Sequence, residues 1–254
     1  MSTKLKIAAA VAAAVLLSAC SSPKHEPMPL VNFTPSMEVT EVWSKGLSSA
    51  EGFLVPAVYD DMVFAAGGKT LTRLNARTGE TEWSVSFDSP ITGGVGSDGY
   101  VTAVGLWDGN LEVVDAEGKV SWEKKLTTEL ASPPVVSHGL VIARTMDTRV
   151  SAFEASSGEL QWTYQKSQPA LTVRLPTRML AHDNFLLVGQ PNGHIVILDI
   201  ASGKPVFEFQ VAQAKGVTEV ERLVDVVGEA STNGTGFDQA DFNSAVAQLH
   251  AQCV

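Results

Sequence analysis

A short phrase that joins a glycine turn to an aromatic residue recurs four times along the chain. The copies read LTRLNARTGETEW, LEVVDAEGKVSW, VSAFEASSGELQW and IVILDIASGKPVF, and they end at Trp83, Trp122, Trp162 and Phe207. In each copy the aromatic residue lies four residues after its glycine, and successive aromatics are 39, 40 and 45 residues apart. A repeat of about 40 residues with this strand–turn–strand texture is typical of a β-propeller or a solenoid.

Each phrase follows two further short strands. Apolar or β-branched runs precede the phrases at residues 61–65, 99–103, 139–143 and 184–188. A further strand precedes each run, at residues 52–58, 91–96, 134–137 and 178–181. Four short antiparallel strands make one propeller blade, so the predicted fold is an all-β propeller. We expect Gly79 and its counterparts to supply a positive φ, and the aromatics to pack between blades, because one sheet cannot bury both faces alone.

The repeat extends backwards but stops towards the C-terminus. Trp43 lies 40 residues before Trp83, so residues 38–47 are predicted as the last strand of a blade whose other strands do not precede it. Residues 228–254 contain no glycine–aromatic phrase in phase, and we expect a truncation or a change of reading frame near Val227. The prediction is a partial propeller over residues 37–227, with about four blades and an orphan N-terminal strand, followed by an aberrant tail.

The N-terminus has the pattern of a processing signal. Lys4 and Lys6 precede an apolar run over residues 7–17, which is too short to span a bilayer but suits a signal peptide over residues 1–19. The run ends in Leu17-Ser18-Ala19-Cys20, which resembles the lipobox of bacterial lipoproteins and predicts acylation of Cys20. An ordinary secreted protein cleaved near Ala19 is the alternative. Residues 20–36 contain four prolines and are predicted to be a tether to the membrane, and a serine after the cysteine favours the outer membrane.

Charge and cysteine content exclude several classes of protein. The net charge is −10 and the basic residues are scattered singly, which argues against nucleic acid as a partner. The two cysteines, Cys20 and Cys253, form no CxxC motif and predict no metal site. No sequence motif of a serine hydrolase, zinc protease or phosphate-binding loop is present, and no catalytic residue is predicted.

The longest interval between repeats points to a protruding loop. The excess lies in TYQKSQPALTVRLPTRML, between Trp162 and His182. Insertions between repeats map to loops on one face, which is often the binding face. Leu171 and Val173 with the adjacent Arg174 suit a protein-binding anchor. A longer connection whose leucine and valine pack inward remains the alternative.

Together, the lipobox, the 40-residue blades and the AxTGxxxW phrase resemble the BamB family of lipoproteins, over about residues 1–227. The family fold is an eight-bladed propeller of PQQ-like repeats, so the likeness covers roughly its first half. The resemblance implies a non-enzymatic scaffold without a cofactor, anchored by lipid at the periplasmic face of the outer membrane. It also implies docking on the BamA subunit of the BAM complex, contact with unfolded outer-membrane proteins, and a role in protein insertion into that membrane.

The resemblance also implies partner-binding residues. An L-x-L-R loop contacts BamA in the family, and its positions here are Leu171, Val173 and Arg174. A second family patch, RLSDVD, begins here at Arg222 and keeps its first aspartate as Asp225, but Val227 replaces the second aspartate. That replacement coincides with the point where the repeat is lost.

Two other functions compete with this one. The AxTGxxxW phrase is shared with periplasmic quinoprotein dehydrogenases, which resemble this chain in their repeats but need a calcium site, a catalytic aspartate and commonly a vicinal cysteine pair. The chain has no vicinal cysteine pair. The other alternative is a non-functional fragment, because four blades leave the ring open and expose strand edges.

Overall fold

The structure is a computed structural model. It describes residues 40–49, 53–167, 178–213, 215, 217, 218, 223 and 226. The chain divides into two units, Met1–Thr40 and Glu41–Val254, and all the elements described below belong to the second.

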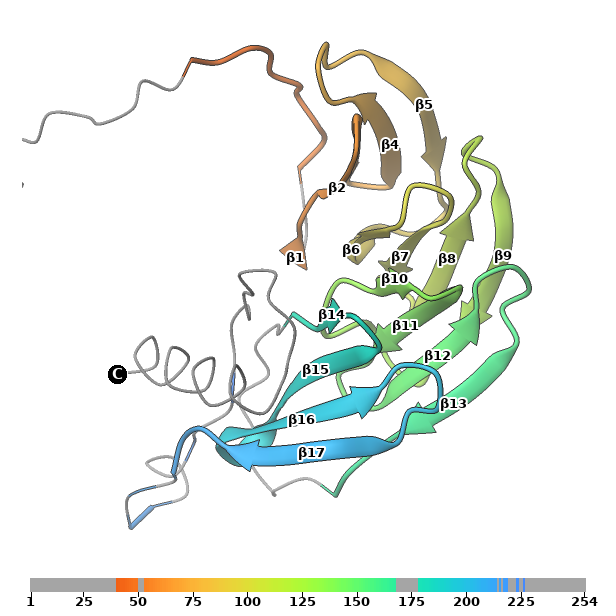
Figure 1. The fold of residues 1–254 in the computed structure, drawn as a ribbon. Helices are drawn as coiled ribbons and strands as arrows, with labels where there is room; N and C mark the ends of the chain where they lie inside the picture. Colours follow the sequence, from red (N-terminus) through yellow and green to blue (C-terminus); the bar gives the residue numbers. More distant parts are fainter. Residues whose placement is uncertain are drawn as a thin grey trace, which may run out of the picture. The chain divides into compact units, whose positions relative to one another are not determined.

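Four sheets of short strands follow one another in chain order (Figure 1). The first sheet comprises β2 (Ala57–Tyr59), β3 (Met62–Gly67), β4 (Thr70–Asn75) and β5 (Thr81–Ser86). The second comprises β6 (Ile91–Ser97), β7 (Thr102–Leu106), β8 (Asn110–Val114) and β9 (Val120–Lys125). The third comprises β10 (Val135–Ser137), β11 (Leu140–Arg144), β12 (Val150–Glu154) and β13 (Leu160–Tyr164). The fourth comprises β14 (Leu180–His182), β15 (Phe185–Gln190), β16 (His194–Asp199) and β17 (Pro205–Gln210), with a 3₁₀ turn at Pro191–Gly193.

The sheets confirm the predicted blades. Consecutive strands within each sheet pair antiparallel, and every predicted strand run over residues 53–213 has a counterpart. One prediction was incomplete, because residues 52–58 were expected to form a single strand. The structure instead has β1 (Phe53–Leu54), which pairs in parallel with β6 of the second sheet, before the chain enters β2 of the first.

Each phased tryptophan docks on the glycine turn of the next sheet. The indole N–H donates to a backbone carbonyl in that turn at 2.8–2.9 Å, in the pairs Trp43–Ala76, Trp83–Ala116, Trp122–Ala155 and Trp162–Ile200. The predicted packing of the tryptophans between blades is therefore confirmed. The hydrogen bond also satisfies the only polar atom of a half-buried indole.

Gly118 illustrates why the turn requires glycine. Its φ is +80°, a left-handed conformation that costs other residues energy. A Cβ at this position would also lie 2.6 Å from the ring of Trp83, which is too close for real atoms. The same two requirements hold under Trp43, Trp122 and Trp162.

The core consists of layers between sheets. Phe64 and Leu71 of the first sheet pack against Ile91 and Val104 of the second. The adjacent residue on β7, Ala103, faces the other way and belongs to the layer shared with the third sheet. A further layer lies between the third and fourth sheets. Alternation along each strand thus buries both faces of the inner sheets.

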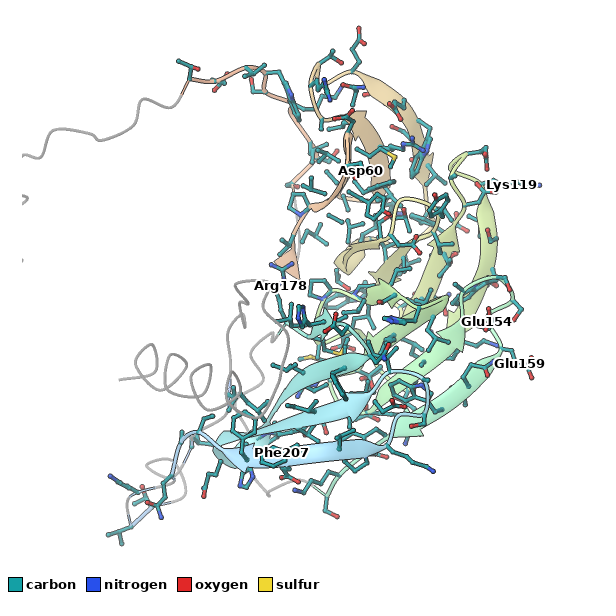
Figure 2. The ribbon with its side chains drawn as sticks, in the orientation of Figure 1. Asp60, Lys119, Glu154, Glu159, Arg178 and Phe207 are labelled. Atoms are coloured by element: carbon teal, nitrogen blue, oxygen red, sulfur yellow. The ribbon has the colours of Figure 1, made fainter. Side chains whose placement is uncertain are left out.

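The two ends of the row differ from the repeats between them. Residues 41–49 are not a strand, since no described strand lies beside them to complete a ladder, although Trp43 docks in phase. At the other end, Phe207 is 45% exposed and its ring centroid lies 6.0 Å from that of Phe209. Figure 2 shows Phe207 on β17, the last strand of the row.

Candidate partner-binding face

The predicted site residues lie outside the part of the chain that the structure describes. This holds for the anchor-loop residues Leu171, Val173 and Arg174, for the patch residues Arg222 and Asp225, and for the acylation site Cys20. The described residues on either side of the loop are Ser167 and Arg178, and the loop therefore connects β13 to β14.

One end of the sheets carries all the connections between blades. In an antiparallel sheet of four strands, the turn between the second and third strands lies at the same end as the exit to the next sheet. Hydrogen bonds between backbone groups tie these segments together: Phe87 donates to Lys69, Leu126 to Gly109, and Met146 to Glu129, at 2.9–3.1 Å. We call this end the loop face. Its described members are residues 67–69, 87–90, 107–109, 126–134, 145–149, 165–167, 178–179 and 190–193.

The predicted anchor loop begins and ends on the loop face. β13 ends at Tyr164 beside Val150, the first residue of β12, and the chain returns at Leu180 to start the fourth sheet. Arg178, labelled in Figure 2, is the first described residue after the loop and precedes β14.

A small ionic cluster joins the start of this loop to the fourth sheet. Lys166 donates to the Glu208 carboxylate of β17, and His194 Nδ1 of β16 lies 3.1 Å from the same carboxylate oxygen. The hydrogen bond from Lys166 is the main reason why the pKa of Glu208 lies below its usual value. Burial raises the pKa of the neighbouring Tyr164 hydroxyl, and the charge of Glu208 adds to that effect. The cluster fastens the chain where it leaves the third sheet.

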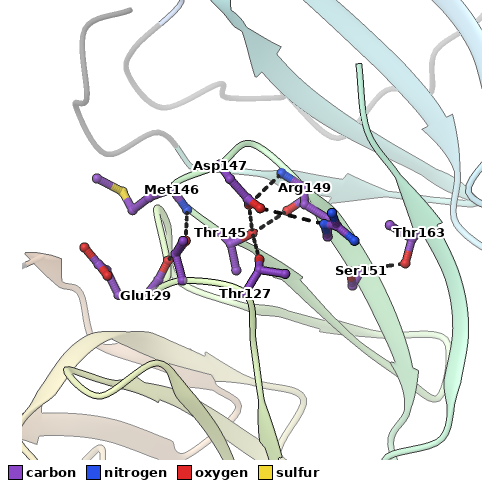
Figure 3. Close-up of polar contacts among 9 residues, drawn as sticks. Thr127, Glu129, Thr145, Met146, Asp147, Arg149, Ser151 and Thr163 are labelled. Atoms are coloured by element: carbon purple, nitrogen blue, oxygen red, sulfur yellow. Dashed lines mark hydrogen bonds and ion pairs between the residues drawn. The ribbon is translucent and has the colours of Figure 1, made fainter. Parts of the chain in front are cut away.

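A second polar cluster lies in the β11–β12 turn (Figure 3). Burial acts to raise the pKa of Asp147, but hydrogen bonds from Thr145, Thr127 and the Arg149 N–H, together with the Arg149 charge, outweigh it and lower the pKa. The Arg149 Nε lies 3.8 Å from the carboxylate, and Met146 N–H donates to Thr128 at 3.1 Å. These contacts join the turn to the connector that leads into the third sheet.

The same turn contains an unusual backbone conformation. Thr148 has φ +62°, whereas the corresponding turns of the other sheets use Gly68, Gly109 and Gly193 at positive φ. A β-branched residue is disfavoured in this region by about 1–2 kcal/mol. The polar contacts of Thr145, Asp147 and Arg149 hold the turn in that conformation.

Sequence reasoning missed one conspicuous residue on this face. Trp107, in the β7–β8 turn, is 67% exposed. A signal for it was available, since the chain has five tryptophans and Trp107 alone falls outside the docking phase.

The described residues provide neither a metal-binding cluster nor a membrane-spanning helix. These residues include no group of three or more histidine, cysteine, aspartate or glutamate side chains arranged to hold a metal ion. Within the same ranges, no helix combines the length and the apolar character needed to cross a bilayer.

Comparison with known proteins gives the relationship of the chain. The protein-family model described as "Outer membrane protein assembly factor BamB" matches residues 67–252. The chain belongs to the BamB family. A BamB relative from Burkholderia pseudomallei is 38% identical over 89% of this chain and 61% of its own length. The chain thus spans about three-fifths of the length of this relative.

Solved structures of a BamB protein and of a dehydrogenase resemble this chain in fold. The crystal structure of BamB from Moraxella catarrhalis superposes with a TM-score of 0.63 and 27% identity, over 74% of this chain and 59% of that one. A quinohemoprotein alcohol dehydrogenase from Pseudomonas putida gives 0.51 and 18% identity, over 65% of this chain and 34% of the other. At that identity the second likeness shows the fold alone. The predicted fold of PQQ-like repeats is confirmed, and the BamB match runs past Val227 into the predicted tail.

Proposed function

We propose that the chain acts as a non-enzymatic scaffold lipoprotein of the outer-membrane β-barrel assembly machinery. The observation that carries the proposal is its membership of the BamB family, whose printed description is an outer-membrane protein assembly factor. The dehydrogenase likeness is confined to the fold and supports no catalytic role.

The proposed partner is the periplasmic portion of the BamA-type barrel subunit, and through it the rest of the complex and its unfolded outer-membrane substrates. The contact is assigned to Leu171, Val173 and Arg174, with Arg222 and Asp225 as a second patch. Two observations support the first of these sites. The loop connects β13 to β14 on the face that carries every other blade connection, and the adjoining Lys166–Glu208 ion pair fixes the point where it leaves the sheet.

Localisation follows from the proposed acylation of Cys20. Acyl chains contribute about 0.8 kcal/mol for each buried CH₂ group, so multiple acylation holds a protein at a membrane. We therefore assign the protein to the periplasmic face of the outer membrane, with its scaffold in reach of the barrel subunit.

Reversing one charge tests the docking loop. Arg174→Glu should abolish capture of the full-length chain by purified periplasmic domains of the barrel subunit, because arginine anchors carry a large share of interface energy. Arg77→Glu is the matched control. Arg77 is an exposed arginine in the β4–β5 turn, at the opposite end of the sheet, and its ion pair with Asp61 contributes little to stability.

The outcomes separate the possibilities cleanly. Loss of capture with Arg174→Glu and retention with Arg77→Glu supports the proposal. Equal capture of both variants and the unmodified chain means that the loop is not the contact. No capture of the unmodified chain under any condition overturns the proposed function itself.

A further inference from the structure

Trp107 is the one tryptophan that the fold does not use. Trp43, Trp83, Trp122 and Trp162 each dock on a glycine turn, whereas Trp107 lies in the β7–β8 turn with 67% of its surface exposed. Its neighbour Leu106 belongs to the core layer between the first and second sheets, whereas Trp107 belongs to neither layer beside the second sheet. Its side chain therefore contributes little to folding.

The backbone beneath this side chain is well held. The Trp107 N–H donates to the Pro90 carbonyl at 2.8 Å, and the Gly109 N–H closes the turn on Leu106 at 2.9 Å. The Asp108 carboxylate accepts the Asn110 N–H at 3.0 Å. A large aromatic group on a fixed turn loses little conformational entropy on binding, which is the property of an interface anchor.

The tryptophan is not a feature of the repeat. The corresponding turns comprise residues 68–69 in the first sheet, 145–149 in the third and 191–193 in the fourth, and none of them contains a tryptophan. It also shares the loop face with the proposed docking loop, since residues 107–109 contact the connector 126–130 and that connector contacts the next turn.

The charges around Trp107 favour a protein partner. Lys69 and Lys125 donate to the backbone carbonyls of Asp88 and Asp108, and the Asp108 carboxylate lies in the turn itself, so the turn has charges of both signs near it. A mixed polar rim around an aromatic centre is typical of protein interfaces. An anionic membrane surface would instead select a cluster of basic residues, and the chain carries a net charge of −10.

We infer that Trp107 is a second anchor for the same partner, extending the docking face from the β13–β14 loop to the second sheet. The inference rests on the proposed function. The partner is a folded periplasmic domain of the barrel subunit. We expect this domain to have an apolar recess that receives the indole ring, and polar groups around the recess that pair with the charges near Trp107.

Binding titrations of full-length variants against the purified periplasmic domains test the inference. Trp107→Ala should weaken binding about tenfold or more without lowering the melting temperature. Tyr100→Ala is the matched control, because Tyr100 is 72% exposed on the β6–β7 turn at the opposite end of the same sheet. The indole emission should also shift to shorter wavelength on binding, and Trp107→Phe should remove that shift.

Three results would overturn the inference. Unchanged affinity for Trp107→Ala, with binding still lost in Arg174→Glu, rejects the second anchor and leaves the proposed function standing. No binding by the unmodified chain rejects both. Weaker capture of Trp107→Ala by anionic phospholipid vesicles, with unchanged affinity for the protein domains, assigns Trp107 to a membrane contact instead.

Discussion

Glu112 is a buried acid at a position where the first and third blades place a hydroxyl group and the fourth places Val196. It lies on β8 with 7% of its surface exposed, directly opposite Glu123 of β9. The equivalent cross-strand pairs are Thr72–Ser84 in the first sheet and Ser151–Thr163 in the third, with oxygens 3.1 and 3.3 Å apart. Burial is the main cause that raises the pKa of Glu112 to about 7, and the charges of Glu123 and Asp108 add to it. Below about pH 7 the Glu112 carboxyl is therefore expected to be mainly protonated.

This pair predicts a pH-dependent stability. A raised pKa means that the folded state binds the proton more tightly than the unfolded chain. The stability from protonated Glu112 is therefore complete below about pH 4.5 and is lost as the pH rises through about 7. Glu112→Gln should flatten the decline in melting temperature between pH 5 and 8, and at pH 8 it should be more stable than the unmodified chain by on the order of 1 kcal/mol, allowing for solvent screening.

The melting temperatures of the unmodified chain and of Glu112→Gln, measured at several pH values, test this prediction. Glu117→Gln, an exposed acid in the β8–β9 turn, removes the same charge without touching the pair and should leave the pH profile unchanged. If the profiles of Glu112→Gln and the unmodified chain coincide, the pair does not control stability in this range.

At the scale of elements, the second sheet is adapted to receive a side chain from the next connector. Gly93 of β6 and Gly105 of β7 are direct cross-strand partners. A Cβ on Gly105 would lie 2.5 Å from the Leu130 side chain, and one on Gly93 would lie 2.7 Å from it. The paired glycines form a notch, and Leu130 fills it while its backbone forms a β-bridge with Thr145 of the β11–β12 turn. Complementary packing of this kind fixes how one blade follows the next.

Removing either half of this contact should destabilise the fold. Leu130→Ala is expected to cost about 2–4 kcal/mol through the cavity it leaves, and Gly105→Ala about 1–3 kcal/mol through overpacking. In the double variant the alanine methyl occupies part of the vacated space, so the combined loss should be clearly less than the sum.

Denaturant unfolding of the four species measures the coupling. Gly46→Ala serves as the control, since a Cβ there meets nothing within 4 Å. Strict additivity of the two losses would mean that Leu130 does not pack in the notch.

At the scale of the whole molecule, stability comes from nearest-neighbour contacts between sheets, as in other repeat proteins. The first and last sheets therefore differ from the inner two. The first carries hydroxyl pairs such as Thr70–Ser86 on the side away from the second, whereas the last carries Phe207 on β17. The proposed role also requires that the protein be anchored at the membrane, and we propose Cys20 as the acylated residue that anchors it.

Cys20→Ser should abolish incorporation of labelled fatty acid and move the protein from the outer-membrane fraction to the soluble periplasmic fraction. The physical reason is the loss of all the buried CH₂ groups of the anchor. Cys253→Ser removes the only other cysteine and should retain both label and location. Label retained in Cys20→Ser, or unchanged fractionation, would rule out this anchor.

The sequence by itself determined the repeat, the four strands per blade and the docking of aromatics between blades. It could do so because glycine conformation, turn chemistry and apolar alternation are local properties that recur at a fixed spacing. It also identified the β13–β14 connection as the longest between blades, although the structure does not describe its central residues. The site residues themselves came from family resemblance, and they remain predictions.

Only the tertiary structure decided which residues meet across blades. Phe53 and Leu54 leave the first sheet for the second, Leu130 enters a notch formed by glycines 25 and 37 residues earlier, and burial raises the pKa of Glu112. The sequence showed Trp107 as a tryptophan out of phase with the others, but only the folded arrangement of the turns shows that its side chain is exposed. These features depend on contacts between segments that are distant in the chain, and no local pattern encodes them.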